Sequence, residues 1–288
     1  MFDAKPLSKF LYLTGLFVIF LCVYSQYFVR YGLITGYLVV YGIPILVVSL
    51  LFGRHLLQRA AKNSKDAAKF GLGLFAVLTV IGILLSIVVL AVLTHFDPHA
   101  ANLLNKPNPV LNVSSNVAWV MIPVSILVVG PAEEYLFRGF IYGGLLSISK
   151  GKHWILLAVV SSVMFASVHA YYALTYSIAS VLPFVQLITF GFAMCITYYW
   201  SGGNILALAL IHGFYDATDF LGVATTNQIG QDAQLAMILV GLALAAIYLP
   251  QKIGIRQKPN PQVQPETTPE IPPPPLHKYS RKFRTFNL

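Results

Sequence analysis

Long apolar blocks divide the sequence, and this feature limits the folds open to the chain more than any other. An α-helix rises about 1.5 Å per residue, so about 20 apolar residues cross the roughly 30 Å hydrocarbon core of a bilayer. Eight segments of about this size can be counted, at residues 10–29, 31–52, 70–94, 117–146, 154–175, 178–200, 204–222 and 234–250. We therefore predict an all-α fold, a polytopic bundle of about eight transmembrane helices.

The composition supports the same interpretation. Charged residues make up 10% of the chain and apolar residues 57%, whereas a soluble domain carries about 25% charged residues. So few charges cannot cover a surface that faces water. Cys22 and Cys195 each lie inside an apolar block and have no metal-type neighbours. We expect them to be small buried hydrophobic residues rather than a disulfide pair.

The net charge of +9 is unevenly distributed along the chain. With the N-terminus inside, the cytoplasmic side would carry Lys5, Lys9, Arg54, Arg59, Lys62, Lys65, Lys69, Lys150, Lys152 and every basic residue after Pro250. The opposite side would carry only Arg30 and Lys106. The positive-inside rule then predicts an N-in, C-in topology. The distribution also favours contact with anionic lipid over nucleic acid, in a multi-pass protein of the cell membrane.

The fourth segment contains ionisable residues, and each costs at least ~2.5–3.5 kcal/mol at the centre of a bilayer on insertion scales. Glu134 and Arg138 are four residues apart on one helix face and can pair. Glu133 points about 100° away from that face and has no such partner on its own helix. A structural clamp explains the Glu134–Arg138 pair, whereas Glu133 favours a role as a general base or acid.

Two further apolar segments carry histidines. Phe165 and His169 lie one turn apart, as do His212 and Asp216. A carboxylate one turn from an imidazole can fix its tautomer, or both can ligate a metal. Gly213 keeps the backbone open to close approach by another helix. Each pair alone could be a structural hydrogen bond, but convergence with the glutamates in one cavity would satisfy more of the buried charges.

Three motifs thus occur in order on separate apolar segments: Glu133-Glu134-x-x-x-Arg138, Phe165-x-x-x-His169 and His212-x-x-x-Asp216. Together they resemble the CPBP intramembrane proteases, which include the type II CAAX prenyl proteases and the Abi proteins linked to bacteriocin processing and immunity. The flanking stretches Phe137-Arg138-Gly139-Phe140 and Gly203-Asn204-Ile205 also resemble this family. The resemblance covers roughly residues 116–220.

The resemblance implies an endopeptidase that cleaves a membrane-associated or lipid-modified, CAAX-like, protein or peptide. It implies that Glu133 activates the attacking water and that His169 helps to position this water. His212 and Asp216 would stabilise the oxyanion or hold a metal. The supporting residues would be Glu134, Arg138 and Phe165.

The sequence leaves a metal cofactor open. Glu133, His169, His212 and Asp216 form a ligand set that one zinc ion could accept. No HExxH motif presents two histidines on one helix. A metal-free mechanism, with a glutamate base and a histidine-lined oxyanion hole, would also hydrolyse a peptide bond.

Two other classes of function stay open. One is a non-catalytic immunity or chaperone-like membrane protein of the Abi type, and the other is a proton-coupled transporter. Transporters also bury Glu, His and Arg, but neither an internal repeat nor a pair of broken helices is visible here.

The same observations predict four parts of the chain. They are residues 1–115 with the first three transmembrane helices, residues 116–222 as the CPBP/Abi-like catalytic core, residues 223–250 with the last transmembrane helix, and residues 251–288 as a disordered, Pro-rich basic tail. The run from Pro272 to Pro275 in the tail prevents helix and sheet.

Overall fold

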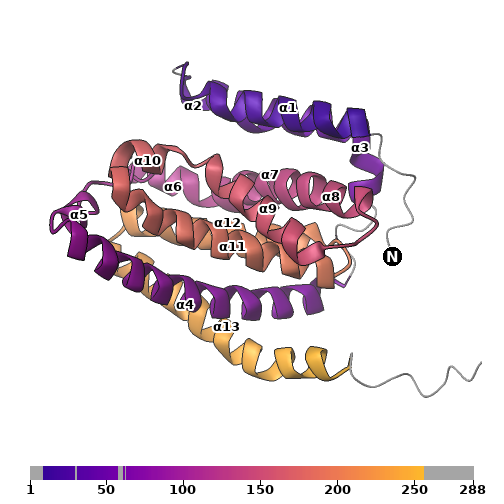
Figure 1. The fold of residues 1–288 in the computed structure, drawn as a ribbon. Helices are drawn as coiled ribbons and strands as arrows, with labels where there is room; N and C mark the ends of the chain where they lie inside the picture. The colour runs from indigo at the N-terminus through magenta and orange to yellow at the C-terminus, as the bar shows by residue number, and fades with distance from the viewer. Residues whose placement is uncertain (1–8, 30, 58–60, 62, 256–288) are drawn as a thin grey trace, which may run out of the picture. The chain divides into compact units, whose positions relative to one another are not determined.

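Helices make up nearly all of the structure, a computed structural model that describes residues 9–29, 31–57, 61 and 63–255 (Figure 1). The α-helices are α1 Lys9–Ser25, α2 Leu33–Tyr37, α3 Ile43–Leu57, α4 Ser64–Phe96, α5 Ala100–Leu103, α6 Ser115–Val124, α7 Gly130–Glu133, α8 Gly143–Ile148, α9 Trp154–Ser167, α10 Tyr171–Tyr176, α11 Val181–Trp200, α12 Ile205–Ala224 and α13 Asn227–Ile255. The π-helical segments are η1 Leu38–Gly42, η2 Ser125–Val129 and η3 Glu134–Tyr142, and η4 Ser177–Ser180 is a 3₁₀ helix. None of the described residues is in a β-strand, which confirms the all-α prediction.

Six helical stretches are long and apolar enough to cross a membrane. They are Thr35–Phe52, Ser64–Phe96, Ser115–Ile148, Tyr171–Trp200, Ile205–Ala224 and Asn227–Pro250. Two shorter apolar helices, Lys9–Ser25 and Trp154–Ser167, correspond to the other two predicted segments. An integral membrane protein is supported by these helices and by the many exposed Leu, Ile, Val and Phe side chains along them. The count of eight spans and the N-in, C-in orientation stay predictions.

The last helix extends beyond the predicted boundary of the tail. α13 continues to Ile255, so residues 251–255, which we expected to be disordered, are helical. The run of closely spaced prolines begins only at Pro259, which explains how the helix extends past residue 250. The chain forms one compact unit as far as Gln251. Residues 256–288, the rest of the predicted tail, lie outside the described residues.

The predicted segment 154–175 is not one continuous helix. α9 ends at Ser167 and α10 begins at Tyr171, so His169 lies in the turn between them. The backbone N–H of His169 donates to the carbonyl of Ala166. Its ring nitrogen Nδ1 lies 2.9 Å from the carbonyl oxygen of Phe165, which the same backbone N–H would bind in a continuing helix. The side chain therefore caps the end of α9.

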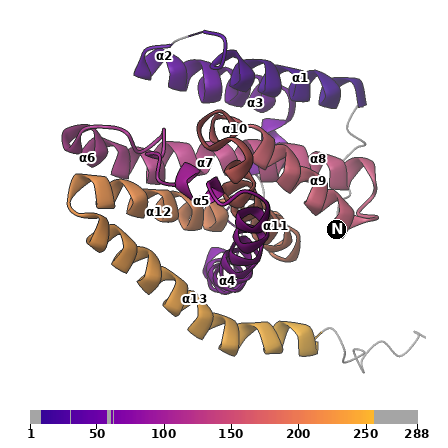
Figure 2. The ribbon, with the colours of Figure 1, turned by 60° about the vertical axis from the view of Figure 1, so that its left-hand side comes forward.

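α12 lies at the centre of the packing and contacts α4, α6, α7 and α11 (Figure 2). It crosses the α7 region where Gly130 faces Gly213. A Cβ on Gly130 would lie 2.7 Å from the backbone nitrogen of Gly213, and one on Gly213 would lie 2.7 Å from the carbonyl oxygen of Ser125. Only glycine permits this separation, so the close approach predicted at Gly213 is confirmed.

The turn before α12 sets where that helix begins. Gly203 has a φ of 99°, which L side chains rarely adopt. Asn204 follows as the N-cap, and its side-chain oxygen accepts a hydrogen bond from the backbone N–H of Ala207 at 2.8 Å. The start of the helix determines which residues face α7, and His212 is among them.

Candidate active site

The two adjacent glutamates lie at a change in helix geometry. Glu133 ends α7 and Glu134 begins the π-helical segment η3. Both are buried, with 8% and 0% of their surfaces exposed. π-helical turns are rare and are frequent at functional sites. The arrangement allows two neighbouring carboxylates to reach the same histidine from different sides.

Glu134 and Arg138 form the ion pair that their spacing predicts. Arg138 donates from a guanidinium nitrogen to Glu134 Oε1 at 2.9 Å, and both side chains are almost fully buried. The guanidinium carbon lies 4.4 Å from the ring centre of Phe165 and 5.6 Å from that of Phe190. The charge of Arg138 is therefore held by one carboxylate and two aromatic faces.

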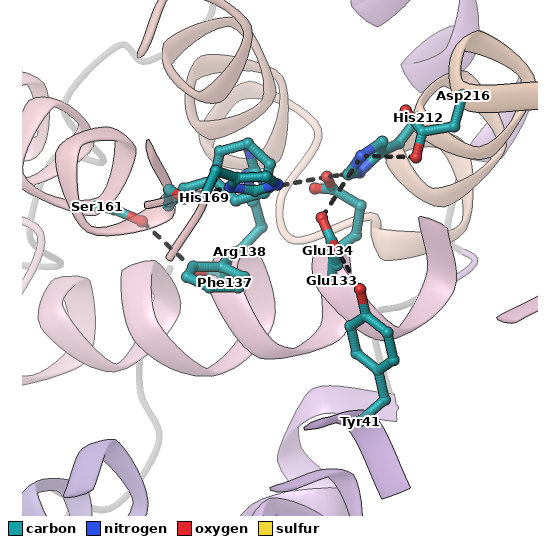
Figure 3. Close-up of polar contacts among 10 residues, drawn as sticks. Tyr41, Glu133, Glu134, Phe137, Arg138, Ser161, His169, His212 and Asp216 are labelled. Carbon is teal, nitrogen blue, oxygen red and sulfur yellow. Dashed lines mark hydrogen bonds and ion pairs between the residues drawn. The ribbon is translucent and has the colours of Figure 1, made fainter. Parts of the chain in front are cut away.

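His212 is the residue that joins the carboxylates (Figure 3). Its Nδ1 lies 2.7 Å from Glu134 Oε1, while its Nε2 lies 3.6 Å from Glu133 Oε2 and 3.4 Å from Asp216 Oδ2. A carboxylate paired with Arg138 is ionised and can only accept, so Nδ1 carries a proton. Nε2 is then the nitrogen directed toward Glu133 and Asp216.

His169 lies at the wall of the site. A carbonyl oxygen can only accept, so the contact to Phe165 means that Nδ1 of His169 carries the proton. In the neutral ring, Nε2 is left as an acceptor. The ring also lies 4.9 Å from the ring of Phe165 and 5.6 Å from that of Tyr171. His169 is thus held in place by its ring contacts with Phe165 and Tyr171.

A cavity of about 1000 Å³ connects these residues. Glu133, His169, His212 and Asp216, the four residues that we predicted as catalytic, all line it, and so does Phe165. Glu134 and Arg138 lie behind this lining. The convergence expected from the sequence is therefore present, with the Glu134–Arg138 pair supporting the wall from outside the cavity.

The comparison with protein families covers this part of the chain. The family model described as Type II CAAX prenyl endopeptidase Rce1-like matches residues 115–218. We refer to these matched residues, which make up less than half of the chain, as the Rce1-like core. The resemblance that the three motifs indicate is thereby confirmed, and it supports a CAAX-type intramembrane endopeptidase as the general class. No curated protein and no solved structure matches the chain.

Every site residue that the sequence predicted lies within the Rce1-like core, but one contact comes from outside it. Tyr41, in η1, donates its hydroxyl to Glu133 Oε1 at 2.6 Å. The sequence gives only a weak signal for this contact. Tyr41 lies in an apolar segment, where a buried tyrosine hydroxyl needs a polar partner. Phe190, whose ring lies 4.7 Å from that of His212, was also missed, because an apolar residue in an apolar helix carries no signal.

The fit of the predicted zinc ligands can be judged from their donor atoms. In the part of the chain that the structure describes, no three His, Cys, Asp or Glu side chains are arranged to hold a metal ion together. His212 donates Nδ1–H to Glu134 and His169 donates Nδ1–H to Phe165, which leaves Nε2 of each ring as the nitrogen that could bind a ligand. The zinc ion stays a prediction.

The cysteines agree with the sequence interpretation. Cys22 and Cys195 are both free and buried. They contribute to packing and lie outside the lining of the cavity.

Proposed function

We propose that the protein is an intramembrane endopeptidase that hydrolyses a peptide bond in a membrane-associated or lipid-modified, CAAX-like, protein or peptide. One observation carries the proposal: the buried carboxylate of Glu133, which lines a large cavity, has its Oε1 held by Tyr41 and its Oε2 facing His212. A cavity of about 1000 Å³ can take a peptide segment several residues long. The Rce1-like core supports the same reaction class.

The first step is attack by water on the scissile carbonyl carbon. Glu133 takes one proton from the water through Oε2, and the acceptor nitrogen of His169 orients the water through its other proton. As the C–O bond forms, the electron pair of the carbonyl moves to its oxygen. The oxyanion is stabilised by His212 when Nε2 carries a proton, and the carboxylate of Asp216 favours that protonated form.

The second step breaks the C–N bond. Glu133 returns its proton to the amide nitrogen, which leaves as an amine, and the oxyanion collapses to a new carboxyl group. Glu134 and Arg138 touch none of the reacting atoms in this scheme. They are positioning residues, because Glu134 orients the ring of His212 and Arg138 neutralises Glu134.

The direct test is cleavage of two quenched fluorescent probes by the purified protein in lipid vesicles. One probe is a farnesylated peptide ending in a CAAX sequence, and the other is an unprenylated peptide with a single membrane anchor. Glu133→Gln should lower kcat by about 10²–10⁴-fold on whichever probe is cleaved, because it removes the base. His212→Ala should also abolish detectable cleavage.

Both variants should unfold at temperatures within a few degrees of the parent protein, so that lost cleavage reports lost chemistry. Full activity in either variant would contradict the proposal. If Glu133→Gln instead supports the full physiological phenotype, the non-catalytic Abi-type alternative is favoured. Flux of a substrate across the same vesicles would favour the transporter.

A further inference from the structure

The cavity above Glu133 occupies one half of the helix bundle rather than its full length. In α4, which begins at Ser64, the lining residues start at Phe75 and reach Leu90. In α12 they run from His212 to Phe220, toward the C-terminal end of the helix. Both helices run toward the same end of the bundle. The cavity therefore extends from the middle of the bundle toward the end where α4 and α12 finish.

Helices that run the other way contribute residues from their first halves. Leu182 and Phe190 line the cavity from α11, and Gln234 lines it from α13. The connecting segments at this end complete the wall, with Asn108 before α6 and Tyr172 in α10. Figure 1 shows α2, α5 and α10 gathered here, so we refer to it as the α5 end.

The cavity is open at this end and on its side. Val110, in the loop after α5, lines the cavity and is 42% exposed, so it lies at the mouth. Ile83 and Ile87 of α4 also line the cavity and are 40% and 58% exposed. These two residues lie in a helix long enough to span the membrane. The side of the cavity therefore faces lipid within one half of the bilayer.

The cations lie at the opposite end. The starts of α1 and α4 and the α8–α9 turn carry one exposed acid, Asp66, among the described residues. The exposed lysines there are Lys9, Lys65, Lys69, Lys150 and Lys152. At the α5 end the corresponding exposed charges are one lysine, Lys106, and two acids, Asp97 and Asp232. Lys-rich and Arg-rich ends of membrane bundles face the cytoplasm, and Asp and Glu residues contribute little to this orientation.

We infer that the catalytic cavity opens to the outer, non-cytoplasmic face and its adjacent leaflet, so that the substrate is a membrane-anchored peptide or protein whose cleaved segment emerges on that face. A prenylated C-terminus held on the cytoplasmic surface would meet the closed, lysine-bearing end. The substrate class rests on the proposed function, whereas the direction of the opening does not.

The direction of the opening is tested by thiol labelling of intact cells. In a Cys22→Ala/Cys195→Ala background, single cysteines are placed at the two ends by Asn105→Cys in the loop after α5 and Lys152→Cys in the α8–α9 turn. Both positions are exposed and lie outside the cavity lining. A membrane-impermeant maleimide should label Asn105→Cys at once and Lys152→Cys only after permeabilisation. The reverse pattern, or equal labelling of both in intact cells, would overturn the inference.

The substrate class is tested with one single-span reporter inserted in two orientations. The same candidate segment is displayed outside the cell in one form and in the cytoplasm in the other. The outward form should be cleaved at least about ten times faster, and cleavage of the cytoplasmic form alone would refute the assignment. In the background that lacks cysteine, Val110→Cys at the cavity mouth should lose cleavage when the impermeant maleimide is added from outside. Failure of the proposed function is distinguishable, because neither reporter would then be cleaved while the labelling pattern would persist.

Discussion

The imidazole of His212 donates Nδ1–H to Glu134 Oε1 over 2.7 Å, although the two residues are 78 positions apart. The same oxygen accepts the guanidinium of Arg138. Glu134 therefore determines which nitrogen of the ring reaches the cavity. Asp216, the partner expected from the helix spacing, contacts that second nitrogen, Nε2. The ion pair within η3 and the histidine of α12 form one connected polar unit.

Removing the cation from this unit should destabilise the protein strongly. Arg138→Met leaves the buried charge of Glu134 without its ion pair, and breaking such pairs costs about 3–5 kcal/mol. Thermal unfolding in detergent should show a large fall in midpoint. Lys69→Met, which removes an exposed cation, should change stability by less than about 1 kcal/mol. The double variant Arg138→Met/Glu134→Met should recover much of the stability but not the activity. Equal midpoints for the two single variants would contradict this account.

The hydroxyl of Tyr41 should matter for the reaction itself. A hydrogen bond to a charged group contributes about 1.5–3 kcal/mol, so Tyr41→Phe should lower kcat/KM by about 10–100-fold, mainly through kcat. Tyr37→Phe is the matched control, because Tyr37 stacks on Tyr41 while its hydroxyl faces the sulfur of Met121. If both variants lose activity equally, or neither does, the hydrogen bond does not position Glu133.

The glycine contact between α7 and α12 should tolerate no side chain. Gly213→Ala places a methyl group 2.7 Å from the backbone of Ile126, so the helices must separate. Overpacking of this kind destabilises by about 1–3 kcal/mol, and the separation should draw His212 away from Glu134. Gly222→Ala, where the nearest atom is 3.6 Å away, should be nearly neutral. The measurements are the unfolding midpoints and cleavage rates of Gly213→Ala and Gly222→Ala. A fully active Gly213→Ala protein would contradict the need for glycine at this helix contact.

Activity should survive removal of divalent metals. The proposed scheme uses Glu133 as the base and His212 at the oxyanion, with no step assigned to a metal. Cleavage should therefore be unchanged after treatment with a chelator and gel filtration. The measurement should be paired with metal analysis of the purified protein. Activity that is lost on chelation and restored by zinc would favour the alternative in which Glu133, His169, His212 and Asp216 act as ligands.

The sequence predicted what depends on spacing within one helix. The apolar blocks indicated the helices, and the four-residue separations indicated that Glu134 lies near Arg138 and His212 near Asp216. It also predicted that Glu133 would find its partners on other helices. Which partners these are depends on how the helices cross, and no local pattern encodes that. The contact between Tyr41 and Glu133 therefore emerged only from the structure.

The same limit explains the errors of local geometry. Segment 154–175 reads as one apolar helix, because nothing in its hydropathy shows that the side chain of His169 bonds the carbonyl of Phe165 and stops α9. The π-helical segment η3 was likewise missed, because π-helical turns are rare and the hydropathy of an apolar segment does not indicate them. Both features lie at residues that face the cavity or support its wall.

The position of Tyr41 has a consequence for protein engineering. Residues 115–218 match the family as a block, yet the hydroxyl that holds Glu133 belongs to η1, which that block does not include. A chimera that received only the matched block would contain Glu133 without the hydroxyl of Tyr41 that binds it. Grafts should therefore carry η1 with the core, and swapping η1 alone between homologues offers a way to adjust catalytic rate while every motif residue stays fixed.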